Sequence, residues 1–268
     1  MRTDISENAA RYYDLSPEFP DDIPFYEQRL PSPASRILEL GCGTGRVLLS
    51  LVEKCGYILG VDVSEAMLSL CRQKLAENGI PPSRADAQQA DITDVDFGVS
   101  FDLIIAPFRV FQGLETDRQV EGFFRTVRNH LSLTGTAILN VFRPSLDPDR
   151  MRREWVTSGE RFRWEVPIEG GRVTLHDRRP RMDREKLVLY PELIYRRYEE
   201  YDLVDEAVLE ISMRSYYPEE LLSLISAEGF RIVNTWGGYA GEPYGEGPEL
   251  IVEFAESAEP LAGGRPRM

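Results

Sequence analysis

A glycine-rich segment is the first part of this chain whose residue types could do chemistry. Gly41, Gly43 and Gly45 directly follow a short apolar segment, 36–40. Glycine lets the backbone turn sharply and lets a ligand approach without a β-carbon in the way. A helix is predicted after the turn, over 46–54, and its first N–H groups would carry a partial positive charge. This arrangement predicts a binding site for a nucleotide-containing cofactor.

Three acidic residues accompany the turn. Glu39 precedes it, Asp62 lies near the end of the second apolar segment (57–63), and Asp91 lies near the end of a third strand candidate (87–92). An acid at the end of the second strand can accept the ribose hydroxyls of an adenosine. A carboxylate beside the turn disfavours a pyrophosphate and suits a cofactor with cationic groups. Arg46 stands where the dinucleotide pattern Gly-x-Gly-x-x-Gly has its third glycine, which is a departure from that pattern.

Four segments, taken in order, resemble the motifs of class I S-adenosylmethionine-dependent methyltransferases: 37–45, 60–67, 90–92 and 101–105. The resemblance covers residues 34–142 well and the part after 215 more loosely. It implies S-adenosylmethionine as the cofactor, with S-adenosylhomocysteine as product. The implied cofactor contacts are Glu39 and the backbone of Gly41, Cys42 and Gly43 at the methionine part, Asp62 at the ribose, Val63, Met67, Asp91 and Ile92 at the adenine, Ala106 at the methyl-transfer site, and Tyr13 over the cofactor.

Candidate substrate residues follow the fourth apolar segment. In open α/β sheets the ligand crevice lies at the carboxyl ends of the strands. Phe108 and Phe111 are therefore expected to form walls of the substrate pocket, and Arg109 to meet an acidic group. An amine acceptor needs placement and loss of a proton, whereas a hydroxyl acceptor needs a general base. His176 is the candidate base, and the choice between a nitrogen and an oxygen acceptor stays open.

The order of the segments predicts the fold class. Apolar strands alternating with helices indicate an α/β fold, with a parallel sheet covered on both faces. The resemblance adds seven strands, mostly parallel, in a doubly wound, Rossmann-like arrangement. From residue 143 the sequence becomes rich in arginine and acidic residues, with strand-like stretches. Residues 143–214 are therefore predicted to form an inserted antiparallel β subdomain that serves as a lid, a substrate contact or a dimer interface. The cofactor domain is expected over 1–142 and 215–255, with a first helix over 3–14 and a flexible tail over 256–268.

The composition narrows the partners. A formal net charge of −14 disfavours nucleic acids and anionic membranes as ligands. No apolar stretch reaches the length of a membrane span and no leader is evident, so a cytoplasmic protein is expected. Three cysteines without metal-type spacing predict no metal site. The sequence therefore predicts methyl transfer to a small molecule; a non-catalytic S-adenosylmethionine-binding protein, a nicotinamide-dependent oxidoreductase and an RNA methyltransferase remain as alternatives.

Overall fold

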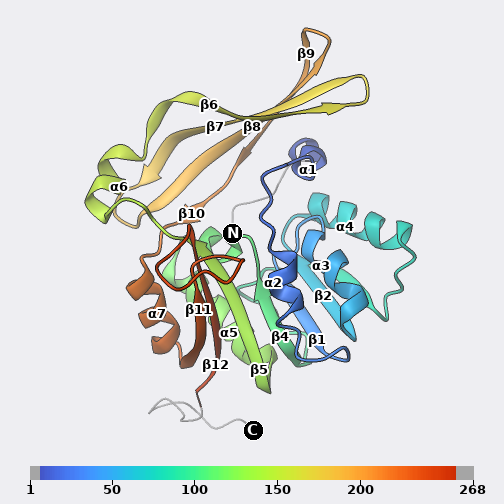
Figure 1. Ribbon diagram of the computed structural model, residues 1–268, viewed down its shortest axis with the longest axis vertical. Coiled ribbons are helices and arrows are strands. Elements are labelled where there is room, and N and C mark those ends of the chain that lie inside the picture. Colours follow the sequence, from blue (N-terminus) through green and yellow to red (C-terminus); the bar gives the residue numbers. More distant parts are fainter. Residues whose placement is uncertain (1–6, 258–268) are drawn as a thin grey trace.

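Two β-sheets organise the chain (Figure 1), in a computed structural model that describes residues 7–257. The larger sheet has seven strands in the order β11-β12-β5-β4-β1-β2-β3. Strand β12 runs antiparallel to both of its neighbours, and the other neighbouring strands are parallel. The predicted α/β class, with a doubly wound and mostly parallel sheet, is confirmed. The strands of this sheet are β1 (Arg36–Leu40), β2 (Tyr57–Asp62), β3 (Ala85–Gln89), β4 (Phe101–Ala106), β5 (Leu131–Phe142), β11 (Phe230–Trp236) and β12 (Glu249–Glu256).

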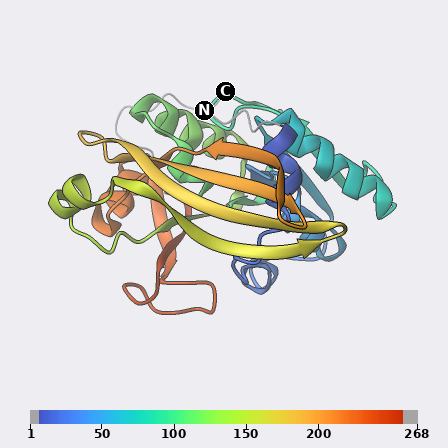
Figure 2. The same cartoon turned by 90° about the horizontal axis from the view of Figure 1, so that it is seen from above.

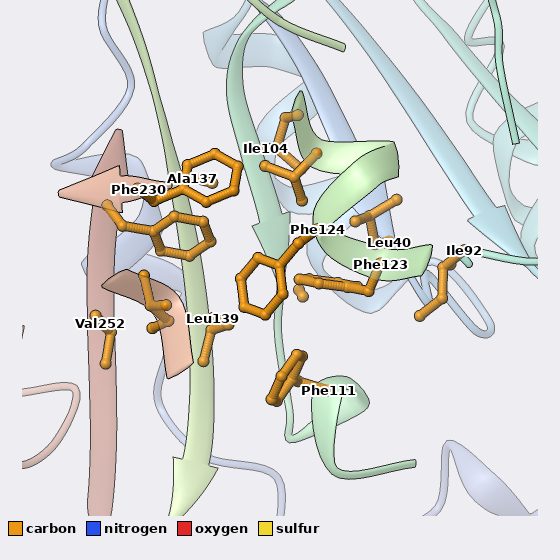
Figure 3. Close-up of a cluster of buried hydrophobic side chains, with 14 of the residues drawn as sticks. Leu40, Ile92, Ile104, Phe111, Phe123, Phe124, Ala137, Leu139, Phe230 and Val252 are labelled. Carbon is orange, nitrogen blue, oxygen red and sulfur yellow. The ribbon is translucent and has the colours of Figure 1, made fainter. Parts of the chain in front are cut away.

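Helices cover both faces of the larger sheet because its strands are apolar on both faces. On one face Ile37 and Leu103 pack with residues of α2, α3 and α4. On the other face Leu38 and Ile104 pack with Phe124 of α5 and with residues of α7, as Figure 3 shows in part. Successive strand residues point to opposite faces, so one strand serves both cores. These helices are α2 (Ile23–Glu27), α3 (Arg46–Leu51), α4 (Glu65–Glu77), α5 (Asp117–His130) and α7 (Pro218–Ala227); the 3₁₀ turns η1 (Val52–Lys54) and η2 (Val110–Gly113) follow α3 and β4.

The second sheet is antiparallel and lies above the first in Figure 1. One of its faces packs Trp164, Leu175 and Tyr195 against Tyr12 of α1. Helix α1 also contacts α4, so it lies between this sheet and the larger unit. Figure 2 shows the strands passing over α1. The elements here are α1 (Glu7–Tyr13), α6 (Pro148–Glu154), β6 (Thr157–Ile168), β7 (Gly171–Asp183), β8 (Val188–Glu199), β9 (Asp202–Glu210) and β10 (Met213–Arg214).

Some element boundaries differ from the expectation. Strand β3 is Ala85–Gln89 rather than 87–92, because its pairing with β2 sets residue 85 opposite Ile58. The expected start of the first helix at residue 3 and nearly all of the expected tail lie outside the described residues, and Glu256 still belongs to β12. The division into 1–142 with 215–255 and 143–214 stays a prediction. Within residues 7–257 no helix is long and apolar enough to cross a membrane.

Candidate functional site

A cavity lies at the carboxyl ends of β1, β2 and β4, where the sequence placed the ligand site. Eight of the predicted site residues line it: Tyr13, Glu39, Gly41, Cys42, Gly43, Asp62, Met67 and Phe108. Five further residues complete the lining: Thr44, Arg46, Val47, Pro107 and Val110. The cavity therefore joins the glycine turn, the end of β4 and the end of α1 in one site.

The glycine turn is shaped by close neighbours and held by Asp62. Gly41 has a φ of +76°, and a β-carbon there would lie 2.5 Å from Val110 Cγ2. Gly43 has a φ of +54°, and nothing lies within 4 Å of the position of its missing β-carbon. The Gly43 N–H donates to Asp62 Oδ2 at 3.0 Å and the Ser64 N–H donates to Oδ1 at 2.9 Å. Each carboxylate oxygen retains a lone pair, so Asp62 can hold the turn and still accept from a ligand hydroxyl.

Glu39 places a buried carboxylate beside the turn. Only 1% of its surface is exposed, and its Oε2 has no hydrogen-bond partner among the described residues. Burial raises the pKa of this carboxyl well above its usual range; Cys71 adds to the increase, and Arg46 opposes it. Burial also raises the pKa of Asp62, against hydrogen bonds from Ser64 and Gly43 that lower it. A buried, unpaired carboxylate in a cavity fits a cationic ligand group, which would favour its ionised form.

The end of α1 is attached to the glycine turn through Asp14. Thr44 Oγ1 donates to Asp14 Oδ1 at 2.5 Å, and Lys74 Nζ donates to Asp14 Oδ2 at 2.6 Å and to the Thr44 carbonyl at 3.0 Å. These contacts place Tyr13 on the cavity wall. Desolvation raises the pKa of Tyr13, so its phenol stays protonated and can donate a hydrogen bond. The sequence analysis assigned no role to Thr44 or Lys74, and it took only Tyr13 from the segment 12–14, which also contains Asp14.

Tyr13, Phe108 and Arg46 line another part of the cavity, with Phe19 packed behind them. Tyr13 packs against Phe19 with ring centroids 5.4 Å apart, and Phe19 against Phe108 at 5.6 Å. The Arg46 guanidinium lies 5.0 Å from the centre of the Phe19 ring. It also binds the fully buried Asp22 through two hydrogen bonds, at 2.5 and 2.7 Å. The sequence marked Arg46 only as a departure from the dinucleotide pattern, whereas in the structure it connects α2 to the cavity.

Two predicted substrate residues do not lie on this cavity, which corrects the sequence-based expectation. Phe111 is completely buried in the core between the sheet and α5, where its ring packs against Phe123 and Tyr216. The Arg109 guanidinium binds Glu249, and Arg109 is not among the residues that line the cavity. Both follow a strand end, but the 3₁₀ turn η2 carries the chain back into the core. The position after a strand is therefore not sufficient to predict that a side chain faces the ligand.

Four other predicted cofactor residues lie outside the lining of this cavity. Ala106 and Ile92 are 1% exposed and belong to the core cluster on the α5 face. Asp91 accepts hydrogen bonds from the backbone and side chain of Thr93, at 2.9 and 2.8 Å. Val63 is half-buried next to Asp62, and its carbonyl accepts from Gln89. The predicted adenine contacts of Val63, Asp91 and Ile92 stay predictions.

His176 lies on the face of the second sheet opposite to the one that packs on α1, and it does not line the cavity, so its assignment as a general base stays a prediction without support from this cavity. Its neighbour Leu175 packs against α1, and successive strand residues point to opposite faces. His176 pairs with Phe162 of β6, whose ring lies 5.6 Å away. The other histidine, His130, is fully buried and accepts a hydrogen bond from the Phe97 N–H at 2.8 Å. Neither histidine lines the cavity.

Comparison with known proteins agrees with this geometry. Residues 37–135 match the family model described as a methyltransferase domain. The chain is 26% identical over 145 residues to dTDP-3-amino-3,4,6-trideoxy-alpha-D-glucopyranose N,N-dimethyltransferase of Streptomyces venezuelae. The aligned region covers 54% of this chain and 56% of that protein. The chain spans 39% to 56% of the length of the first three curated relatives that it matches.

Solved structures share the fold over nearly the whole chain. The CcbJ methyltransferase from Streptomyces caelestis superimposes with a TM-score of 0.75 at 20% identity, covering 96% of this chain and 99% of that one. CalS10 from Micromonospora echinaspora, an amino pentose methyltransferase solved with S-adenosylmethionine bound, gives a TM-score of 0.66 at 22% identity, covering 91% and 94%. At these identities the likeness establishes the fold, including the second sheet. The resemblance expected from the sequence is confirmed.

Proposed function

We propose that this chain, which carries a methyltransferase domain of the class I S-adenosylmethionine-dependent fold, transfers a methyl group from that cofactor to a nitrogen or oxygen atom of a small molecule. The observation that carries the proposal is the pairing of two carboxylates around one glycine turn. Glu39 offers a buried carboxyl group whose Oε2 has no hydrogen-bond partner among the described residues, and Asp62 offers a carboxylate held by the turn itself. A cofactor with a cationic amino acid end and a ribose end matches this pair.

The residues present fit S-adenosylmethionine. Glu39 and the backbone of the turn would hold the methionine part, Asp62 the ribose hydroxyls, and Met67 an apolar side of the adenosine. The open space at Gly43 would let the ligand approach the backbone closely. When bound, this cofactor supplies a methyl group that its cationic sulfur has already activated.

The chain's own residues would then mainly position the reactants. Tyr13 and Phe108 line the cavity and Phe19 packs against both rings, so these aromatic residues would limit the entry of water on this side, and Pro107 lines the cavity at the end of β4. Alignment of two reactants without competing water accounts for much of the rate in such displacements. Tyr13 would donate a hydrogen bond, because its pKa is raised and a phenolate does not form at neutral pH. An amine acceptor agrees best with a cavity that histidine does not line, and the named activity of the Streptomyces venezuelae relative supports a nitrogen acceptor.

The second sheet is proposed to cover the site and to contribute to the acceptor pocket. It packs on α1, and α1 carries Tyr13 on the cavity wall. A homodimer through this sheet is a further proposal, supported by apolar side chains exposed on or near its outer face, among them Phe162 at 56% and Val208 at 45%. A cytoplasmic location and the absence of nucleic acid partners stay predictions from the sequence, the latter from the net charge of −14.

The proposal is tested by calorimetry and thermal unfolding with S-adenosylmethionine, S-adenosylhomocysteine and NAD measured side by side. Binding of the first two without NAD is expected; binding of NAD alone would refute the proposal in favour of an oxidoreductase. Incubation with methyl-labelled cofactor and a small-metabolite pool, with and without added RNA, then separates an enzyme from a binding protein. Label that enters RNA rather than metabolites would contradict the small-molecule assignment.

A further inference from the structure

A strained turn carries Phe108 onto the cavity wall. Phe108 and Arg109 adopt left-handed backbone conformations in succession, with φ of +51° and +67°. Residues with side chains rarely occupy this region, and they persist there only where the surrounding contacts fix them. The Val110 N–H closes the turn on the Pro107 carbonyl at 3.3 Å. Since one hydrogen bond within the turn does not explain two strained residues, contacts from elsewhere must hold it.

Those contacts come from two strands that are distant in sequence. The backbone N–H of Arg109 donates to Asn140 Oδ1 at 2.9 Å, and the Arg109 guanidinium donates to the Glu249 carboxylate. Asn140 Nδ2 donates to Glu249 Oε2 at 3.0 Å. The register of β5 and β12 pairs Asn140 with Ile251 and Phe142 with Glu249, so Asn140 and Glu249 project from the same face of adjacent strands. Asn140 therefore fixes the strained backbone, and Glu249 fixes both Asn140 and the Arg109 side chain.

The burial of these groups indicates that they serve the turn. Asn140 is 1% exposed and Glu249 is 7% exposed. A buried carboxylate costs free energy unless it is paired, and apolar residues would join β5 to β12 without that cost. Neither Asn140 nor Glu249 lines the cofactor cavity, whereas Phe108 does. Their effect on the cavity must therefore pass through the turn.

We propose that Asn140 and Glu249 are positioning residues that hold the Phe108–Arg109 turn in its strained conformation and so keep the Phe108 ring on the wall of the cofactor cavity. The inference rests on the proposed function in one respect, because the cavity is taken to bind S-adenosylmethionine. It adds two residues that touch neither the cofactor motifs nor the cavity. It also assigns Arg109 to the support of the turn rather than to the substrate.

The test is a double-mutant cycle with S-adenosylhomocysteine as the probe, measured by calorimetry well below the unfolding temperature. Phe108→Ala and Glu249→Ala are each expected to weaken binding by about tenfold, and the double variant to stay within about twofold of Phe108→Ala alone, since coupled sites are not additive. Glu249→Gln should recover part of the affinity, because its amide oxygen can still accept from Asn140. Glu253→Ala is the matched control. It removes a carboxylate of the same strand that accepts a hydrogen bond from Asn234, and it should bind S-adenosylhomocysteine normally.

A second pair of variants keeps the inference falsifiable if Glu249→Ala does not fold. Glycine adopts a positive φ without strain, so Arg109→Gly should bind S-adenosylhomocysteine more tightly than Arg109→Ala, although both lose the guanidinium. Equal affinities in this pair, additive losses in the cycle, or a Glu249 variant with a lower unfolding temperature and unchanged affinity would each overturn the inference. Failure of the unsubstituted protein to bind the probe would instead refute the proposed function.

Discussion

The two sheets of this protein differ in how their faces are covered and in the residues that their strands carry. The larger sheet is covered on both faces by helices, so its central strands β1, β2 and β4 are mostly apolar, and Glu39 and Asp62 lie near the carboxyl ends of two of them, on the cavity. The second sheet is covered by α1 on one face only, and its other face carries ion pairs such as Arg196 with Glu160 and Glu206. The comparison teaches that a polar residue in the larger sheet points to a functional or positioning role, because burial makes it costly. A polar residue on the outer face of the second sheet carries much less information about function.

The largest expected effect is in the first sheet, at Asp62. Asp62→Ala removes the acceptor for the Gly43 and Ser64 N–H groups and the proposed ribose contact. Loss of a charged hydrogen-bond acceptor costs about 2–3 kcal/mol, so binding of S-adenosylhomocysteine should fall by about 100-fold in calorimetry. Asp94→Ala, at an exposed carboxylate of the same unit, is the control. Unchanged affinity at Asp62→Ala would show that the assignment of the motifs is wrong.

The next effect is a pH dependence carried by Glu39. Its pKa is raised by burial in the free protein, and a bound cation would lower it, so binding releases a proton. Affinity should therefore rise with pH, by up to about tenfold per unit below the raised pKa, and then level off. The sign for stability is opposite: the contribution of protonated Glu39 is present at low pH and is lost as pH rises through the raised pKa.

Calorimetry in buffers of different ionisation enthalpy measures the proton release directly. Glu39→Gln should remove the part of the proton release that comes from Glu39, and it should weaken binding. At pH values above the raised pKa of Glu39, the same substitution should raise the unfolding temperature of the free protein. A variant whose proton release matches that of the unsubstituted protein would show that another group carries the dependence.

A smaller effect is expected where the two regions meet. The Tyr12 hydroxyl and Arg11 both donate to Asp205 Oδ2 of β9 at 2.5 Å, and these bonds attach α1 to the second sheet. Asp205→Ala should weaken cofactor binding by about fivefold, since a hydrogen bond of this kind contributes about 1 kcal/mol. Asp202→Ala, at the exposed start of the same strand, is the control. Equal behaviour of the two variants would mean that α1 holds Tyr13 without help from the second sheet.

The smallest effect is expected at His176, on the outer face of the second sheet. His176→Gln should leave the affinity for S-adenosylhomocysteine and the rate of methyl transfer within about twofold of normal, as for most substitutions away from a site. Rates are measured with the acceptor found in the metabolite-pool assay. A rate loss at constant affinity would return His176 to the reaction and would mean that this face of the sheet turns toward a substrate.

The fold and the residues around the glycine turn could be predicted, because residues close in sequence determine both. The alternation of apolar segments and helices predicted a parallel sheet covered on both faces, and the family resemblance predicted its doubly wound arrangement; Gly41 and Gly43 of the turn line the cavity with Glu39 and Asp62. These residues are close in sequence to the strand ends that place them. Phe111 was misplaced because the direction of its side chain depends on the η2 turn, and the face on which His176 lies depends on strand register; the sequence specifies neither locally.

The sequence by itself determined the fold class and the residues beside the glycine turn, because burial on both faces demands apolar strands and a sharp turn demands glycine. Only the tertiary structure decided which distant groups complete the site. Asp22 reaches Arg46, Asp14 reaches Thr44, and Glu249 reaches Arg109 across 140 positions of the chain. The last pair forms because the sheet brings the ends of β4 and β12 together although they are distant in the sequence, and the first two form because α1 and α2 pack beside the glycine turn.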